Sequence, residues 1–217
     1  MEERFPGSLT GPGRGANLGG GRNMALGTVT ADSYELRFDT GRICLDLLAT
    51  AHPVERLGSV EVLRGWIAGS GLVPPDTALT HADASWPAAF RELRGQLAPL
   101  VRGRPAPYDR PLARVNELAR AAPPVPRAVP GEDGLLVRRL DGPPGLAALL
   151  AAVARDAVDL LTDPVARASL RQCEGDNCPI VYVDTSRGRR RRWCSSEVCG
   201  NRERVARHRR RAALARA

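Results

Sequence analysis

The sequence predicts an α+β fold in which a mixed α/β N-terminal domain, with more helix than strand, precedes a small C-terminal module built around four cysteines. Three observations support this prediction. Apolar residues recur at helical spacing in several segments of residues 31–168, whereas only short segments alternate as strands do. A length of 217 residues suits one medium domain plus a small module. Four of the five cysteines lie within residues 171–217.

Residues 1–30 are predicted to be a disordered tail rich in Gly and Pro. The segment lacks the apolar stretch that secretory signals carry. It is either a flexible tail or an over-extended gene start, with Met24 as the alternative first residue. No apolar run in the chain approaches the roughly 20 residues of a membrane helix, so a soluble, cytosolic protein without a membrane partner is expected.

The N-terminal domain, residues 31–168, is expected to open with a strand. Tyr34–Phe38 favours a short strand that a turn closes. The apolar segment Ile43–Leu48 fits a helix or a strand equally well. Ser59 is expected to cap a helix that ends near Gly69, because its hydroxyl can accept a hydrogen bond from a free amide of the first turn.

Three further helices and one strand complete this domain. The helices are predicted at 87–101, 111–120 and 145–162, where Leu, Val and Ala recur at intervals of three and four residues. The Pro-rich segment 121–134 is predicted to be a loop, and 135–140 a strand.

The four C-terminal cysteines form two pairs with identical spacing, Cys173 with Cys178 and Cys194 with Cys199. Two such pairs around a short basic segment are typical of a tetrahedral site in which four thiolates hold one structural Zn²⁺. Protein ligands would fill all four positions, so no water would be activated. Two disulfides or free thiols are the alternatives, and a reducing cytosol disfavours the disulfides.

This module, residues 169–217, is expected to be treble-clef-like: a knuckle, a hairpin and then a helix. Residues 180–183 favour a strand, and 189–193 are expected to return as its partner. A basic C-terminal helix is predicted at 197–215. Cys199 would then lie on its first turn, where the helix dipole favours a thiolate.

The positive charge of the chain is concentrated in this module. Residues 171–217 contain 13 Arg and 5 acidic residues, a formal charge of +8, whereas the rest of the chain contains 19 of each and is neutral. The asymmetry indicates a polyanionic partner. Solvated charge is the plainer interpretation. The residues expected to contact phosphates are Arg189, Arg190, Arg191, Arg192, Arg202, Arg204, Arg207 and Arg211, with Arg209 and Arg216 beside them.

The segment RQCEGDNCPIVYVDTSRGRRRRWCSSEVCGNRERVARHRRR closely resembles the CGNR zinc finger, a family named for the sequence found here at Cys199–Arg202. Residues 31–168 resemble the ABATE domain that usually precedes this finger, notably in ICLDLLAT and SVEVLRGWIAGSGL. Where that family often has Asn, this chain has Ala49. The resemblance implies a bacterial DNA-binding protein that regulates transcription under stress.

Several other residues of the module have two interpretations. Gly200 is expected to allow a close approach of the chain near the metal. Asn201 and Arg202 either bond the cysteine sulfurs and turn carbonyls or read nucleic acid, and the first is favoured because they adjoin a ligand. Trp193 is expected to fill the module's core rather than to stack on a base. Val198, Val205 and Ala212 are expected to face that core as well, while Cys44 is expected to be a buried thiol and His208 a surface residue.

Two functional alternatives to DNA binding remain. RNA binding would use the same arginines, and a protein-interaction finger would use the same zinc site. An enzyme is not expected, because the three His are scattered and no nucleophile motif or phosphate-binding loop occurs. Residues 31–168 leave room for a small-molecule effector, but no residue pattern names that ligand, the target site or the oligomeric state.

Overall fold

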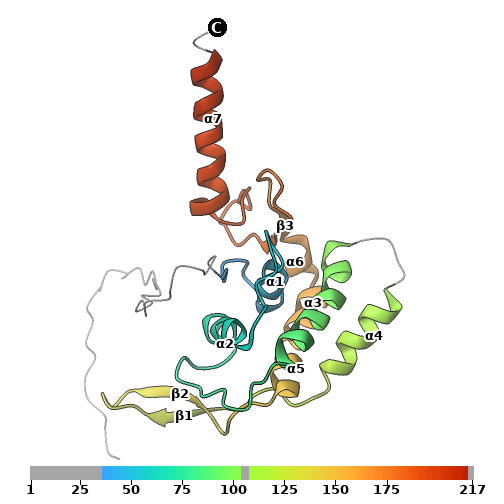
Figure 1. The fold of residues 1–217 in the computed structure, drawn as a ribbon, viewed down its shortest axis with the longest axis vertical. Coiled ribbons are helices and arrows are strands. Elements are labelled where there is room, and N and C mark those ends of the chain that lie inside the picture. The colour runs from blue at the N-terminus through green and yellow to red at the C-terminus, as the bar shows by residue number, and fades with distance from the viewer. Residues whose placement is uncertain (1–35, 104–107, 215–217) are drawn as a thin grey trace, which may run out of the picture. The chain divides into compact units, whose positions relative to one another are not determined.

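The computed structural model describes residues 36–103 and 108–214, so the predicted tail at 1–30 lies outside the described residues. Helix dominates this part of the chain, as predicted, and its strands form two antiparallel pairs. The elements are α1 (Ile43–Ala49), α2 (Val60–Gly69), α3 (Trp86–Arg102), α4 (Asp109–Leu118), β1 (Pro126–Pro130), β2 (Leu136–Leu140), α5 (Leu146–Thr162), α6 (Pro164–Ala168), β3 (Leu170–Gln172), β4 (Val181–Val183), the π-helical turn η1 (Ser196–Gly200) and α7 (Asn201–Leu214) (Figure 1).

The larger of two hydrophobic cores belongs to the helices. Helices α1, α3, α4 and α5 pack against one another, and α2 packs on α3. The rings of Trp66 and Phe90 meet edge to face with centroids 5.6 Å apart, a favoured aromatic geometry. The predictions for α3, α4 and α5 are confirmed to within two residues at each end. None of the described helices has the length and hydropathy needed to cross a lipid bilayer.

The structure resolves two predictions near the start of this domain. The apolar segment at 43–48 is helix α1. The Ser59 hydroxyl accepts a hydrogen bond from the Val62 amide at 3.3 Å, which confirms the predicted cap of α2.

The strand predicted at Tyr34–Phe38 is wrong for its described part, because residues 36–38 belong to no strand. Leu36 and Phe38 instead pack against the helical core. The Phe38 ring lies so close to Gly69 that a Cβ built there would be 2.5 Å from it. Apolar alternation therefore reflected packing on helices rather than membership of a sheet.

The second correction concerns the Pro-rich segment predicted to be a loop, because β1 lies within it. β1 pairs with β2 from Pro126↔Leu140 to Pro130↔Leu136. Proline is tolerated here because a two-stranded sheet has only edge strands, where a missing N–H can face away from the partner. An open surface depression of about 360 Å³ lies along this hairpin.

The C-terminal module joins the N-terminal domain through a strand edge, and the described part of the chain belongs to one compact unit. The Val183 amide of β4 donates to the carbonyl of Thr40 at 2.8 Å, and the Asp184 amide donates to the carbonyl of Ser169 at 2.8 Å. Ala49 of α1 lies in the module's own small core. The module therefore contacts the N-terminal domain at the segment just before α1.

A buried carboxylate holds this contact segment in place. Asp46 Oδ1 accepts hydrogen bonds from the Thr40 hydroxyl at 2.7 Å and from the Thr40 amide at 3.2 Å. Burial raises the pKa of Asp46 to about 6, against the opposing effect of the Thr40 hydrogen bonds. At neutral pH the protein therefore holds a charged carboxylate where a neutral one would be more stable.

We expect the unfolding free energy to reveal this carboxylate. Because the folded pKa of Asp46 lies above the unfolded value, its contribution to stability is fully present below about pH 4 and is lost as the pH rises through about 6. Between about pH 7.5 and about pH 5, the wild type should gain about 1 kcal/mol relative to Asp46→Asn. Denaturant titrations of both proteins measure this difference, and a gap that does not change with pH would contradict it. Any zinc released in acid lowers the stability of both proteins, so its effect cancels in the difference between their unfolding free energies.

Candidate metal centre

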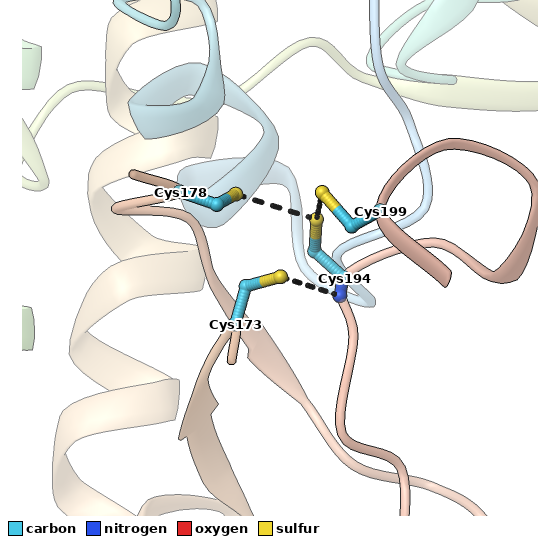
Figure 2. Close-up of side chains that lie close together, drawn as sticks. All are labelled: Cys173, Cys178, Cys194 and Cys199. Atoms are coloured by element: carbon cyan, nitrogen blue, oxygen red, sulfur yellow. Dashed lines mark hydrogen bonds between the residues drawn. The ribbon is translucent and has the colours of Figure 1, made fainter. Parts of the chain in front are cut away.

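The four C-terminal cysteines converge on one point from different segments (Figure 2). Their sulfurs all lie within 4.8 Å of one another. Cys194 Sγ is 3.7 Å from Cys178 Sγ and 3.6 Å from Cys199 Sγ. These separations are far longer than a disulfide bond of about 2.05 Å, and all four thiols are free.

A zinc ion fits this donor set. Four sulfurs at about 2.3 Å from a tetrahedral Zn²⁺ lie about 3.8 Å from one another, close to the separations observed here. Cys194 is fully buried, and the other three cysteines are at most 6% exposed. One structural Zn²⁺ therefore has four protein ligands in a dry site with no open position.

Electrostatics within the cluster call for a cation. The contact with Cys178 and the guanidinium of Arg37 lower the pKa of Cys194 to about 5, although burial opposes this. Burial and the contact with Cys194 raise the pKa of Cys199 to about 11. The contact with Cys194, followed by burial, also raises the pKa of Cys178 above its usual value. Four crowded sulfurs cannot all be thiolates unless a cation offsets their charge, and Zn²⁺ supplies it.

Local backbone structure positions three of the four cysteines. The Cys173 amide donates to the carbonyl of Ile180 at 2.9 Å, and the Cys178 amide closes the knuckle by donating to the carbonyl of Gly175 at 3.1 Å. Ser195 caps η1 by accepting from the amides of Glu197 and Val198. That turn carries Cys199, which lies just before α7 rather than within it.

Two further groups hold the sulfurs, and the sequence did not reveal either one. Backbone amides of Gly175 and Cys194 lie 3.4 and 3.3 Å from Cys173 Sγ. A Cβ at Gly175 would be 3.3 Å from Cys199 Sγ, a tight contact that glycine avoids. The position of Gly175 between Cys173 and Cys178 was the one sequence feature that could have indicated this role. The second group is Arg37, whose position 157 residues before Cys194 leaves no pattern along the chain.

The strand predicted at 189–193 is wrong. β4 pairs with β3 instead, from Leu170↔Val183 to Gln172↔Val181, and residues 189–193 contain no strand. Apolar alternation could not distinguish the two partners, because both are short and polar. The returning segment still reaches the knuckle, since the Glu174 amide donates to the carbonyl of Arg192 at 2.9 Å.

The four arginines at 189–192 divide into two groups. Arg191 is occupied within the fold: its guanidinium donates to the carbonyls of Trp193, Cys194 and Asp39 and lies 4.4 Å from the centroid of the Tyr182 ring. Arg192 is paired with Glu174 at 2.6 Å and lies over the Trp193 ring.

The other two, Arg189 and Arg190, are exposed, and within residues 36–103 and 108–214 neither guanidinium makes a hydrogen bond or an ion pair. The Arg190 amide donates to the Ser186 hydroxyl at 3.1 Å. Trp193 packs against the module's core, as expected.

Helix α7 differs from the expectation that one stripe would pack. Val198 is 42% exposed and Val205 is 43% exposed, and no residue of α7 is buried. Ala212 is partly exposed. The reason is that the module's core ends at η1, before α7 starts. The apolar residues that recur every seven positions therefore have no core to pack against. Within the described part of the chain, the exposed arginines of α7 are Arg202, Arg204, Arg207, Arg209, Arg210 and Arg211, and Arg216 lies outside the described residues.

The remaining candidates are placed as follows. Gly200 is buried against the Trp193 ring and the carbonyl of Ser195. Asn201 and Arg202 are exposed at the start of α7. In the described residues, the groups recorded on the sulfurs are Arg37 and backbone amides rather than the side chains of Asn201 and Arg202. Cys44 is buried in the helical core, and His208 is on the surface of α7.

Two family models match the chain. Residues 41–164 match ABATE, described as a putative stress-induced transcription regulator. Residues 169–212 match the CGNR zinc finger. The second match starts just before β3 and contains all four clustered cysteines. The first match ends at the start of α6. No curated protein sequence matches the chain.

Proposed function

Because the chain belongs to the ABATE family, we propose that it is a zinc-dependent DNA-binding regulator of transcription that contacts DNA through its CGNR zinc finger. Arg189 and Arg190, with the arginines of α7, would contact the phosphates. The zinc has a structural role, because all four of its ligand positions are cysteine sulfurs. The protein is proposed to act without catalysis, in the cytoplasm, where thiols stay reduced.

The observation that carries this proposal is the exposed, unpacked helix α7. Its 14 residues span about 21 Å. It contains six arginines and one acid, Glu203, which pairs with Arg210 at 2.9 Å. A helix of this length without packing is marginal in water, and like charges weaken it further. A polyanion would remove that repulsion, and a helix of this diameter fits the major groove of DNA.

A second basic element lies in the loop between β4 and Cys194. Asp184 holds this loop by accepting hydrogen bonds from the amides of Ser186 at 2.9 Å and Arg191 at 3.0 Å. Arg189 and Arg190 are therefore presented on an ordered turn. Arg191 and Arg192 are committed to contacts within the fold and would contribute less to phosphate binding.

A salt titration of the zinc-loaded full chain tests the proposal. Roughly five phosphate contacts give a log–log slope of about −4 to −5 for a short mixed-sequence DNA duplex, because each contributes about −0.9. Fluorescence anisotropy measures the affinity at each salt concentration. The double variant Arg189→Ala/Arg190→Ala should reduce the slope by about two, whereas Arg110→Ala/Arg120→Ala, in exposed residues of the N-terminal domain, should leave it unchanged.

Two outcomes would favour the alternatives. A slope near zero would overturn the nucleic-acid proposal and leave a protein-interaction finger. Binding to duplex RNA that DNA does not displace would indicate RNA as the partner, because only RNA has the 2′-hydroxyl that distinguishes the two. A small-molecule effector of the N-terminal domain stays a prediction.

A further inference from the structure

We infer that Arg37, which precedes both matched regions, is a functional part of the zinc centre: its guanidinium supports the Cys194 thiolate from outside the coordination sphere and links zinc affinity to the docking of the finger. The inference concerns the metal site alone and does not depend on nucleic-acid binding.

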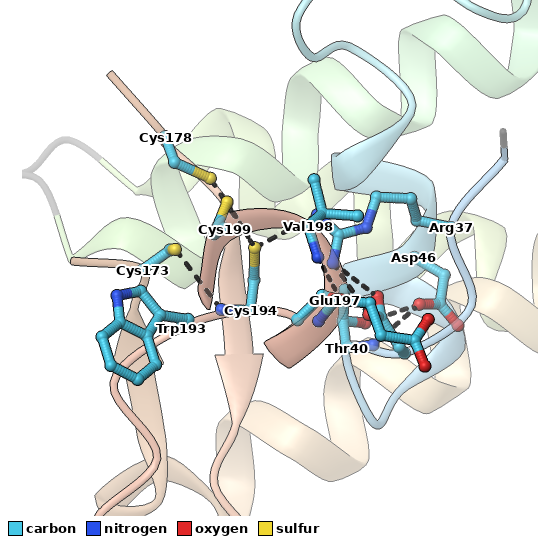
Figure 3. A network of polar contacts seen from close by, with 12 residues as sticks. Arg37, Thr40, Asp46, Cys173, Cys178, Trp193, Cys194, Glu197, Val198 and Cys199 are labelled. Carbon is cyan, nitrogen blue, oxygen red and sulfur yellow. Dashed lines mark hydrogen bonds and ion pairs between the residues drawn. The ribbon is translucent and has the colours of Figure 1, made fainter. Parts of the chain in front are cut away.

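The geometry of the guanidinium is specific (Figure 3). Arg37 Nη1 donates to Cys194 Sγ at 3.1 Å. Arg37 Nη2 donates to both carboxylate oxygens of Asp39, at 3.0 and 2.8 Å. The side chain of Arg37 is only 16% exposed, so the contact with sulfur is largely shielded from water. Asp39 therefore holds the guanidinium by one nitrogen while the other faces the metal ligand.

The opposite side of the same segment is held by the finger. Arg191 donates to the carbonyl of Asp39 at 3.1 Å and also to the carbonyl of Cys194. Cys194 is thus bound through its sulfur by an arginine of the N-terminal segment and through its carbonyl by an arginine of the finger. Two reciprocal contacts fix Arg37 and Cys194 relative to each other.

The hydrogen bond from Arg37 to Cys194 should affect zinc affinity because the metal site carries a buried negative charge. Four thiolates and one Zn²⁺ carry a net charge of −2, and burial makes that charge costly. Hydrogen bonds to sulfur spread the charge, and such outer partners typically change metal affinity by about 10- to 100-fold. Cys173 Sγ receives backbone amides. Among the residues described, the only donor outside the cysteine cluster recorded for Cys194 Sγ is Arg37.

The experiment compares three full-length variants by zinc competition with a chromophoric chelator. Arg37→Ala should bind zinc at least about 10-fold more weakly than the wild type. Arg37→Lys keeps the charge but not the planar fork, so it should lose several-fold. Arg64→Ala is the matched control, because Arg64 is also a partly buried arginine that donates to a carbonyl, that of Ala82, at 2.9 Å.

A second measurement separates support of the sulfur from general destabilisation. In Co²⁺-substituted protein, the sulfur-to-cobalt charge-transfer band should shift in both Arg37 variants and stay in place in Arg64→Ala, because only the former alter the donor strength of Cys194. An unshifted band, or an affinity loss no larger than that of Arg64→Ala, would overturn the inference. If Arg37→Ala does not fold, the band and affinity of Arg37→Lys decide the question by the same criteria.

Discussion

Complete removal of zinc is expected to unfold the C-terminal finger while leaving the helical core of the N-terminal domain folded. The finger's core contains the four cysteines and few other apolar side chains: Ala49, Ile180, Tyr182 and the partly buried Trp193. So small an apolar area cannot offset the entropy of ordering the chain. Zinc binding, on the order of 10 kcal/mol for structural sites, should therefore supply most of the stability.

Hydrogen exchange with and without a chelator measures this result. Amide protection should disappear at Cys173 and Cys178, whose N–H groups are bonded only within the finger, and should persist in α5. The matched variants are Cys194→Ala, which should lose the metal, and Cys44→Ala, which should keep one zinc per chain because Cys44 lies in the helical core. Protection of the finger after all zinc has been removed would contradict the prediction.

The second large effect is expected on α7. Changing Arg204, Arg207 and Arg211 to Ala together should weaken DNA binding by roughly 100- to 500-fold at about 0.1 M salt. Each phosphate contact contributes about 0.9 log units to the binding constant for every tenfold decrease in salt below about 1 M, and three contacts would be lost. Zinc content should not change, because none of these side chains contacts a sulfur, and Arg204 reaches only the carbonyl of Ser196 at 3.4 Å.

The control for this variant removes the same charge elsewhere. Arg102, Arg110 and Arg120 are exposed arginines of the N-terminal domain, and their joint replacement by Ala should leave binding nearly unchanged. Alanine favours helix more than arginine does, so the substitutions should not unfold α7. Weaker binding would then reflect the lost arginines rather than a lost helix. Equal effects of the two triple variants would show that net charge, rather than α7, governs the interaction.

The sequence was sufficient for features that depend on local spacing. Two cysteine pairs with equal spacing specified the metal centre, because a tetrahedral site needs ligands that neighbouring turns can deliver. Helical periodicity located α3, α4 and α5, since an amphipathic helix repeats its apolar residues whatever it packs against. The accumulation of arginine in the last segment likewise needed no structure to be recognised.

Contacts between distant residues were decided only by the tertiary structure. β4 pairs with β3 rather than with the basic segment after it, because short strands carry too little sequence information to specify a partner. Arg191 lies in a run of four arginines, yet it binds carbonyls of the fold. Arg37 meets Cys194 across 157 residues. Residue type and spacing determine which groups can bind a metal or a phosphate, but packing determines which of them are left exposed to do so.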